Sequence, residues 1–268
     1  MARLQVAEGR SIYYEQHAGT RLPVVLIHGW GMSCRVWDTT LTALKQAGHE
    51  VIAFDQRGCG FSDKDFATTS VTSSAQDVAM LVQHLGKPRV VVNGWSLGGA
   101  IAVAAAGLLG KACAGVVLTA GATPRYTQAE GFPYGGPAGS AAQTVAVLRA
   151  DRANFLMGLT KGVSAEPQSA AVEQWLWSIF MQAAPAADDA LADLDALDQR
   201  AALAALDVPV LSMVGARDAI VPADICRYAA SIAKRGKVAE FAQSGHAPFL
   251  EEGPRYREVL LDFLRSLD

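Results

Sequence analysis

Residues 89–109, RVVVNGWSLGGAIAVAAAGLL, are the stretch that decides the fold. The apolar run 89–94 is typical of a buried strand, and the Ala-rich segment 97–109 is typical of a helix. Between them, GWSLG forms a G-x-S-x-G pattern centred on Ser96. A strand-to-helix turn sharp enough to expose a serine hydroxyl needs small residues two positions before and after it, because larger side chains would collide. The pattern therefore predicts that Ser96 is a nucleophile, with a helix N-terminus behind it that favours negative charge.

Comparable apolar runs recur along the chain and alternate with helical patterns. We expect strands at 3–7, 11–16, 23–28, 50–54, 89–94, 115–119, 209–214 and 237–242. We expect helices at 36–47, 71–86, 97–109, 223–233 and 253–267. This alternation indicates a parallel sheet with crossover helices, and strands that are apolar throughout, such as PVVLIH, indicate that helices cover both faces. The sequence therefore predicts an α/β fold with a mostly parallel, eight-stranded sheet.

The alternation stops near residue 121 and resumes near residue 207. The interval contains EGFPYGGPAGS and then helical patterns at 141–158, 168–183 and 188–205. An insertion that leaves and re-enters the sheet at its carboxyl edge is typical of a helical cap over a cleft. We therefore expect a core domain formed by 1–121 and 207–268, and a helical cap formed by 122–206 and inserted after the sixth strand.

A serine hydroxyl is a weak nucleophile unless a base takes its proton, so the sequence should also supply a histidine. His246 lies in SGHAPFLEEGP, a loop between the last predicted strand and the last predicted helix. The other histidines are better explained by solvent exposure (His17, His49 and His84) or by a structural hydrogen bond at a strand end (His28). We therefore assign His246 as the general base.

The acid that orients the histidine should follow the serine and precede the histidine in a chain of this architecture. Asp218, in VGARDAIVP, comes directly after the predicted strand 209–214. Asp207 precedes that strand, and Asp224 is expected to begin the next helix. Asp218 is therefore the predicted acid.

An oxyanion hole requires two backbone N–H donors. Leu97 follows the serine and supplies one of them. HGWG, directly after the strand 23–28, makes a tight turn at the same edge of the sheet, so we assign the second donor to the backbone of Trp30. The Trp30 ring is expected either to contact substrate or to pack in the core.

The predicted cap helices have extensive apolar faces, which indicate a hydrophobic substrate pocket. Helical spacing of apolar residues usually reflects core packing, and this explanation stays open for each of them. As candidate substrate contacts we name Trp30, Phe155, Met157 and Trp177.

Two further groups of residues near the predicted site are interpreted as structural. Asp55 and Arg57, in FDQRGCG, are expected to brace a loop as an ion pair. The four cysteines contain no CxxC pair, so they predict neither a disulfide framework nor a metal site, and Cys34 and Cys59 are not needed as nucleophiles.

Composition restricts the class of protein. The 268 residues are 51% hydrophobic and 18% charged, as in a packed globular protein. A formal net charge of −3 without a basic cluster argues against nucleic acid as a partner. The N-terminal residues alternate like a hairpin rather than forming a signal peptide, and no stretch is long enough to span a membrane. We therefore expect a cytoplasmic protein. Separately, we expect a monomer or a weak dimer.

Five segments, in this order, resemble the α/β-hydrolase superfamily: HGWG, FDQRGCGFSD, GWSLGG, GARD and SGHAPFLEE. HGWG, GWSLGG and GHAPF together most resemble the pimeloyl-acyl-carrier-protein methyl ester esterases and their carboxylesterase relatives. The resemblance covers about 20–120 and 207–267 and is weak in the cap. It implies an eight-stranded sheet, a four-helix-like lid, no cofactor, and triad roles for Ser96, Asp218 and His246.

The expected function is that of a serine carboxylesterase acting on small, fairly apolar esters through an acyl-enzyme intermediate. The same triad also serves a thioesterase, a lactonase, a carbon–carbon bond hydrolase or a cofactor-free perhydrolase, and a ligand receptor could retain it. Dehalogenases and epoxide hydrolases would require an aspartate in place of Ser96.

An acyl carrier protein is disfavoured as a partner, because the predicted cap is acidic and charge complementarity with an acidic carrier calls for basic residues. Its basic residues are Arg125, Arg149, Arg152, Lys161 and Arg200. Its acidic residues are Glu130, Asp151, Glu166, Glu173, Asp188, Asp189, Asp193, Asp195 and Asp198.

Overall fold

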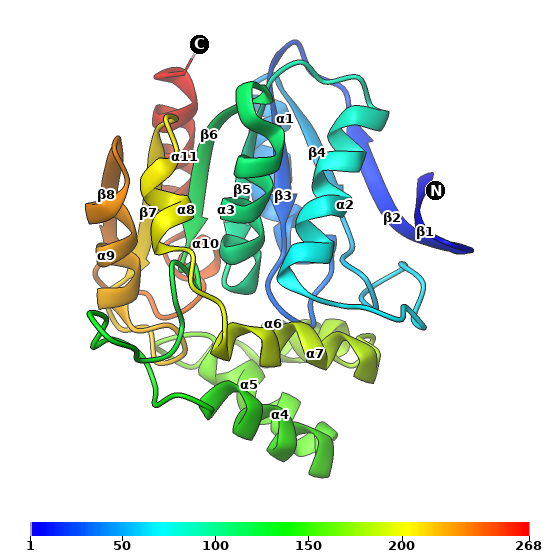
Figure 1. The fold of residues 1–268 in the computed structure, drawn as a ribbon, viewed down its shortest axis with the longest axis vertical. Helices are drawn as coiled ribbons and strands as arrows, with labels where there is room; N and C mark the ends of the chain where they lie inside the picture. The colour runs from blue at the N-terminus through cyan, green and yellow to red at the C-terminus, as the bar shows by residue number, and fades with distance from the viewer. Residues whose placement is uncertain (1, 268) are drawn as a thin grey trace.

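The computed structural model describes residues 2–267, in which eight strands pair into one sheet (Figure 1). The strands are β1 (Ala2–Ala7), β2 (Arg10–His17), β3 (Arg21–Ile27), β4 (His49–Phe54), β5 (Val90–Trp95), β6 (Cys113–Thr119), β7 (Val210–Gly215) and β8 (Gly236–Phe241). Their spatial order is β1-β2-β4-β3-β5-β6-β7-β8. β2 pairs antiparallel with β1 and β4, and the remaining pairs are parallel. The predicted fold class is confirmed.

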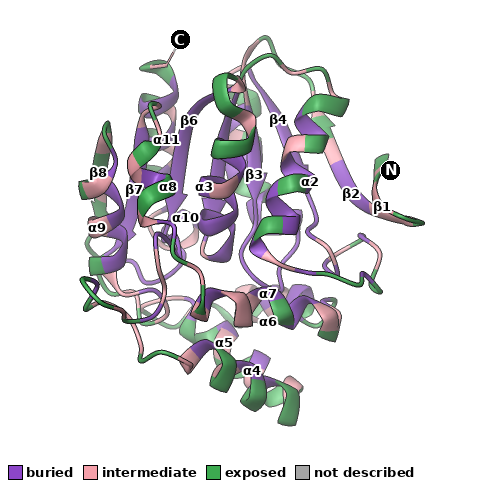
Figure 2. Ribbon diagram, in the orientation of Figure 1, coloured by how far each residue is buried: buried purple, intermediate pink, exposed green. Residues whose placement is uncertain are grey.

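Helices bury both faces of the sheet (Figures 1 and 2). One face carries α2 (Val71–His84), α3 (Leu97–Leu109) with the 3-10 turn η2 (Gly110–Ala112), α8 (Arg200–Ala205) and α9 (Ala223–Ile232). The other carries η1 (Cys34–Trp37), α1 (Asp38–Gln46), α10 (Pro248–Glu251) and α11 (Gly253–Arg265). Residues 24–27 of β3 are fully buried, and each such aliphatic side chain contributes roughly 1.5–3 kcal/mol. Within residues 2–267 no helix has the length and apolar character to cross a bilayer, and the cytoplasmic location stays a prediction.

A layer of short helices lies across the carboxyl edge of the sheet (Figure 1). It contains α4 (Ser140–Ala150), α5 (Arg152–Gly162), α6 (Ala170–Phe180), η3 (Pro185–Ala187), α7 (Asp188–Ala192) and η4 (Asp193–Asp195). The helical pattern expected over 141–158 is interrupted at Asp151, whose side chain caps α5 by accepting the N–H of Asn154 at 3.4 Å.

Helix α8 lies outside this layer of short helices. It falls inside the range assigned to the cap, 122–206, but packs against α3 and α9 on the face of the sheet (Figure 1). Gln199 anchors its start, because the side chain donates to the carbonyl of Ala100 in α3 and the backbone N–H donates to that of Pro124, both at 2.8 Å. The Ala- and Leu-rich sequence of α8 suits either layer, so only tertiary contacts place it. Below, "cap" denotes residues 122–199.

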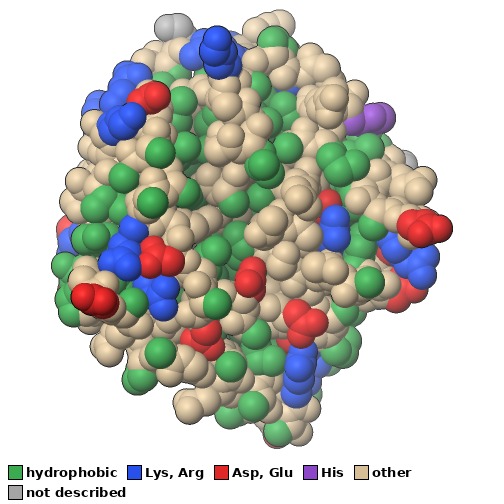
Figure 3. Space-filling view, viewed as in Figure 1, with side chains coloured by type: hydrophobic (Ala, Val, Ile, Leu, Met, Phe, Trp, Pro, Cys, Tyr) green, Lys and Arg blue, Asp and Glu red, His purple; other side chains and the backbone are tan. Residues whose placement is uncertain are grey.

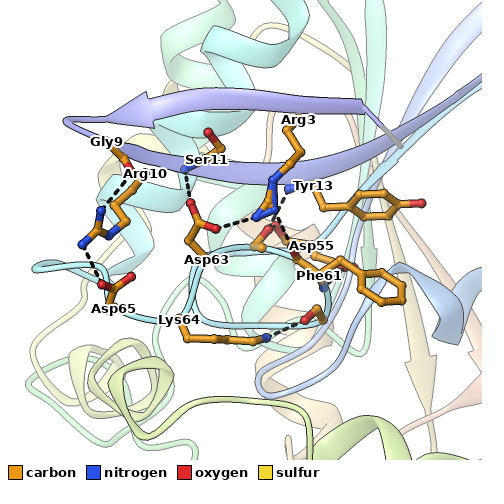
Figure 4. A network of polar contacts seen from close by, with 12 residues as sticks. Arg3, Gly9, Arg10, Ser11, Tyr13, Asp55, Phe61, Asp63, Lys64 and Asp65 are labelled. Atoms are coloured by element: carbon orange, nitrogen blue, oxygen red, sulfur yellow. Dashed lines mark hydrogen bonds and ion pairs between the residues drawn. The ribbon is translucent and has the colours of Figure 1, made fainter.

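The turn after β4, residues 55–65, is tied to the β1–β2 hairpin (Figure 4). Arg3 donates to Asp63 at 2.5 Å, and the backbone N–H of Ser11 donates to the same carboxylate at 2.7 Å. The antiparallel hairpin therefore braces a loop that approaches the carboxyl edge of the sheet.

The expected ion pair in this turn has a different partner from the one predicted. Asp55 is fully buried and accepts the backbone N–H groups of Cys34 and Phe61, each at 2.7 Å. Arg57 instead forms a bidentate pair with Asp77 of α2, with both N–O distances 2.7 Å. Both acids are therefore structural, and burial raises the pKa of Asp77.

All four cysteines are buried free thiols. Burial raises the pKa of Cys113 to about 11 and that of Cys59 to about 12. These thiols are therefore neutral near pH 7, as expected of small core residues rather than nucleophiles.

Replacing Asp77 with alanine is expected to lower the free energy of unfolding by about 3–5 kcal/mol, because Arg57 would keep its charge in a buried site without its partner. The matched control is Asp65→Ala, which breaks an exposed ion pair. The side chain of Asp65 is 69% exposed and that of its partner Arg10 is 39% exposed. Asp65→Ala should lower the free energy of unfolding by less than about 1 kcal/mol. Urea unfolding monitored by circular dichroism measures both, and equal losses would contradict the prediction.

Candidate active site

Ser96 lies in a strained turn between β5 and α3. Its φ and ψ angles are 57° and −123°, a region that residues other than glycine rarely adopt. A Cβ atom on Gly94 would collide with the carbonyl of Gly98, and one on Gly98 would collide with that of Ile27. The predicted need for small residues on both sides of the serine therefore has its physical cause in these close backbone contacts.

Two hydrogen bonds join this turn to the end of β6. The N–H of Ser96 donates to the carbonyl of Thr119 at 3.0 Å, and the N–H of Ala122 donates to the carbonyl of Ser96 at 2.9 Å. The position of the serine is therefore set by the sheet rather than by a free loop.

The predicted base and acid are hydrogen-bonded to each other. Nδ1 of His246 lies 2.7 Å from Oδ2 of Asp218, and the two side chains are 3% and 1% exposed. The other oxygen, Oδ1, accepts the backbone N–H groups of Ile220 at 2.8 Å and Val221 at 2.9 Å. A carboxylate that accepts all of these bonds requires the proton on Nδ1, so Nε2 of the imidazole is left as the basic atom.

Ser96 and His246 line the same cavity. Five apolar side chains of the cap line it: Phe155, Leu159, Val163, Phe180 and Leu191. The other lining residues carry no Lys, Arg, Asp or Glu side chain. Of the candidate substrate contacts, the structure places Trp30 and Phe155 in the wall.

Met157 and Trp177 are corrections, because neither lines this cavity. On α5, Phe155 and Leu159 are four residues apart and share one face, whereas Met157 turns to the opposite side and is 36% exposed. Trp177 packs against the apolar core instead. Helical spacing from Phe155 could have identified Leu159, but no local pattern distinguishes which face of an apolar helix meets the cleft.

The turn that contains Trp30 is held by His28. Its Nδ1 donates to the carbonyl of Gly29 at 2.7 Å, and its Nε2 accepts the backbone N–H of Gln56 at 3.0 Å. These partners require a neutral imidazole. Burial lowers the pKa of His28 and so also favours the neutral form. The expected structural role of His28 therefore has a specific geometry.

The two predicted oxyanion donors are available. Within residues 2–267, neither the N–H of Trp30 nor that of Leu97 donates to a backbone or side-chain acceptor. The Trp30 indole donates to the carbonyl of Ala187 in the cap at 3.0 Å, so the turn also contacts the cap.

Protonation of His28 is expected to destabilise the fold in mild acid. Because its pKa is lowered below the unfolded value of about 6.5, the unfolded chain binds the extra proton first. The contribution of neutral His28 to the free energy of unfolding is therefore complete above about pH 6.5. It decreases as the pH falls below this value, by at most about 1.4 kcal/mol per pH unit.

The measurement is the free energy of unfolding in urea at pH 7.5 and 5.5. His28→Asn removes this titration, so its stability should fall less between the two pH values than that of the wild type. An identical fall in both proteins would show that His28 does not titrate in this range.

Known proteins resemble this chain over nearly its whole length. A family model described as the alpha/beta hydrolase fold matches residues 23–253. The chain is 30% identical over 243 residues to the pimeloyl-[acyl-carrier protein] methyl ester esterase of Klebsiella pneumoniae (strain 342), covering 89% of this chain and 91% of the relative. It is 28% identical over 276 residues to the bifunctional esterase/perhydrolase DCH of Acinetobacter calcoaceticus, covering 99% and 100%.

A solved structure is also similar to this fold. The esterase from Exiguobacterium antarcticum superposes with a TM-score of 0.94 at 26% sequence identity, covering 98% of each chain. The family model accounts for the same segments in which the strand-turn-helix at Ser96 and the loops of Asp218 and His246 lie. The chain therefore belongs to the α/β-hydrolase family.

Proposed function

We propose that this protein is a serine hydrolase that cleaves carboxylic esters. The observation that carries the proposal is the buried 2.7 Å hydrogen bond between His246 and Asp218, in the wall of a cavity that Ser96 also lines. A serine, a histidine and a carboxylate that holds the histidine in one tautomer are the groups that nucleophilic acyl transfer requires.

In the proposed first half-reaction, Oγ of Ser96 attacks the ester carbonyl carbon while Nε2 of His246 takes the hydroxyl proton. The carbonyl oxygen becomes an oxyanion, which the N–H groups of Trp30 and Leu97 stabilise. As the C–O bond to the alcohol breaks, the imidazolium returns the proton to the leaving oxygen. Asp218 stabilises the imidazolium throughout.

The second half-reaction repeats these steps with water. Nε2 of His246 takes a proton from water, whose oxygen attacks the acyl carbon. The intermediate then collapses, Ser96 regains its proton, and the carboxylic acid leaves. This chain's own residues supply each proton transfer.

The cavity supports small, fairly apolar esters as substrates. Its wall combines aromatic and aliphatic side chains, with Thr144 and Tyr126 as additional polar groups. The Tyr126 hydroxyl already donates to the carbonyl of Ile220 at 3.1 Å, and that of Thr144 to the carbonyl of Ser140 at 2.9 Å. A charged acyl chain would therefore enter without a counterion, which is costly.

The surface around the cap argues against a carrier protein as the natural partner. Each arginine of the range 122–206 has a carboxylate within ion-pair distance: Arg125 and Arg200 at Asp198, Arg149 at Asp189, and Arg152 at Asp188. Figure 3 shows acidic and basic side chains side by side over α7 and α4, to which Asp189 and Arg149 belong. Paired arginines offer little attraction to an acidic carrier.

Ser96→Ala and Asp218→Asn are expected to lower the turnover of p-nitrophenyl acetate and butyrate by about 10³-fold or more, because members of a triad act as a unit. Asp224→Asn is the matched control, since Asp224 lies on α9 and forms an exposed ion pair with Arg227. Its kcat should stay close to that of the wild type. Multiple turnover by the wild type distinguishes an enzyme from a ligand receptor. Retention of a tenth of the wild-type activity in Ser96→Ala would refute the assignment of Ser96 as the nucleophile.

The wild type should also prefer free esters to the same acyl group on a carrier protein. Competition between a soluble methyl ester and the matching acyl-carrier-protein ester at low salt is expected to give comparable or higher kcat/KM for the soluble ester. Thioesters and lactones in the same panel test the alternative reaction types. A kcat/KM at least about tenfold higher for the carrier-bound ester, falling steeply with added salt, would overturn this preference.

A further inference from the structure

The loop that carries His246, residues 242–247, is held by a carboxylate that takes no part in the proposed reaction. Oε1 of Glu251 accepts the N–H of Gly245 at 2.9 Å and that of Ala247 at 3.3 Å. These are the two residues that flank the histidine. One oxygen of Glu251 therefore restrains the backbone on both sides of the proposed base.

The second oxygen of Glu251 contacts the cap. Oε2 accepts the N–H of Ala165, which follows α5, at 2.7 Å. The backbone of His246 makes a parallel contact, because its N–H donates to the carbonyl of Val163 at 2.8 Å. Val163 lines the cavity. Residues 163–165 of the cap and 245–247 of the loop are thus joined by one backbone hydrogen bond and by the hydrogen bonds that converge on Glu251.

There is no room for these two segments to slide past each other. A Cβ atom on Gly245 would lie only 2.6 Å from the backbone nitrogen of Ala165. The glycine before His246 therefore permits the close approach, and the carboxylate of Glu251 spans it.

Glu251 has no counterion that would explain its position. Among residues 2–267, no Lys or Arg lies within ion-pair distance of it. Burial raises its pKa, Asp218 adds to this effect, and the three backbone N–H groups oppose it. A half-buried carboxylate with only backbone donors is retained at an energetic cost, so its value lies in the geometry that it maintains.

The neighbouring Glu252 is an internal comparison. It also contacts the loop, through the N–H of Gln243 at 3.0 Å and the hydroxyl of Ser244 at 2.7 Å. It has a cation nearby, Arg255 at 3.5 Å, and within residues 2–267 its hydrogen bonds go to the loop and not to the cap. The two glutamates therefore brace the same loop, but only Glu251 holds the residues next to His246 and the cap together.

We propose that Glu251 is a positioning residue that couples the cap to the orientation of the base. This inference rests on the proposed role of His246. With the cap in contact, Glu251 fixes the backbone on both sides of the histidine and so aims Nε2 at Ser96. Separation of residues 163–165 from the core removes one of the three N–H partners and loosens this restraint, so the base is fully ordered only beneath a closed cap.

The kinetic test compares Glu251→Gln, Glu251→Asp and the control Glu252→Gln. In Glu251→Gln one oxygen becomes an NH₂ group that opposes a backbone N–H, so kcat is expected to fall about 10- to 100-fold, with a smaller change in KM. A Tm for Glu251→Gln equal to that of the wild type would show that the fall in kcat does not come from unfolding. Glu252→Gln should keep kcat within about threefold of the wild type.

The pH profile distinguishes positioning near the base from a general loss of stability. Asp218 is a charged group that acts on Glu251, and His246 lies between the two residues whose N–H groups Glu251 accepts. Loss of the negative charge of Glu251 is therefore expected to disfavour a protonated imidazole at His246. The midpoint of kcat/KM against pH should therefore shift downward in Glu251→Gln. It should stay at the wild-type value in Glu251→Asp, which keeps the charge but is too short to reach both segments, and whose kcat should also fall.

A readout that does not require activity is amide hydrogen exchange. The N–H groups of Ala165, Gly245 and Ala247 should exchange faster together in both Glu251 variants, whereas Glu252→Gln should leave Ala165 unchanged. If Glu251→Gln does not fold, Glu251→Asp carries the test. Unchanged exchange at Ala165, or wild-type kcat in both Glu251 variants, would overturn the coupling. Absence of ester turnover by the wild type would instead refute the proposed function. The exchange measurement would then still show whether Glu251 holds the cap at Ala165.

Discussion

The close approach of three backbone segments around Gly94 and Gly98 is the constraint on which the rest of the site depends. Gly98 lies against the carbonyl of Ile27 at the end of β3, and Gly94 lies against Gly98 itself. This contact keeps Ser96 at a positive φ angle, which costs about 1–3 kcal/mol and persists only because the neighbouring strands hold it. The sheet thereby stores strain in the residue that the proposed chemistry needs most exposed.

The parallel sheet explains how residues far apart in the chain meet. Ser96, Asp218 and His246 each follow a strand, β5, β7 and β8 respectively. Because the carboxyl ends of parallel strands lie at one edge, loops after them converge there, and a ligand cleft at this edge is a general property of such sheets. The cap then covers that edge with apolar side chains.

The cap is attached to both halves of the proposed machinery. Trp30, on the side of the oxyanion donors, donates to Ala187, and His246, on the side of the base, donates to Val163. Cavity shape and catalytic geometry are therefore linked through short hydrogen bonds rather than through distant packing. A change in the cap that alters substrate size is expected to alter turnover as well.

The sequence by itself determined the elements and the positions of the chemistry-bearing groups. Strands buried on both faces are continuous apolar runs, and a strained strand-to-helix turn needs glycine at fixed offsets from Ser96, so both leave local signals. Chain order was enough to choose Asp218 over Asp207 and Asp224, and the structure places it against His246.

Tertiary structure alone decided which side chains meet across the chain. It placed α8 on the sheet, paired Arg57 with Asp77 instead of Asp55, turned Phe155 inward and Met157 outward, and brought Glu251 to the cap. None of these choices leaves a local pattern, because an apolar helix face or a surface carboxylate has the same sequence whichever neighbour it contacts. Such contacts depend on the packing of segments that are tens of residues apart, and only the folded chain specifies them.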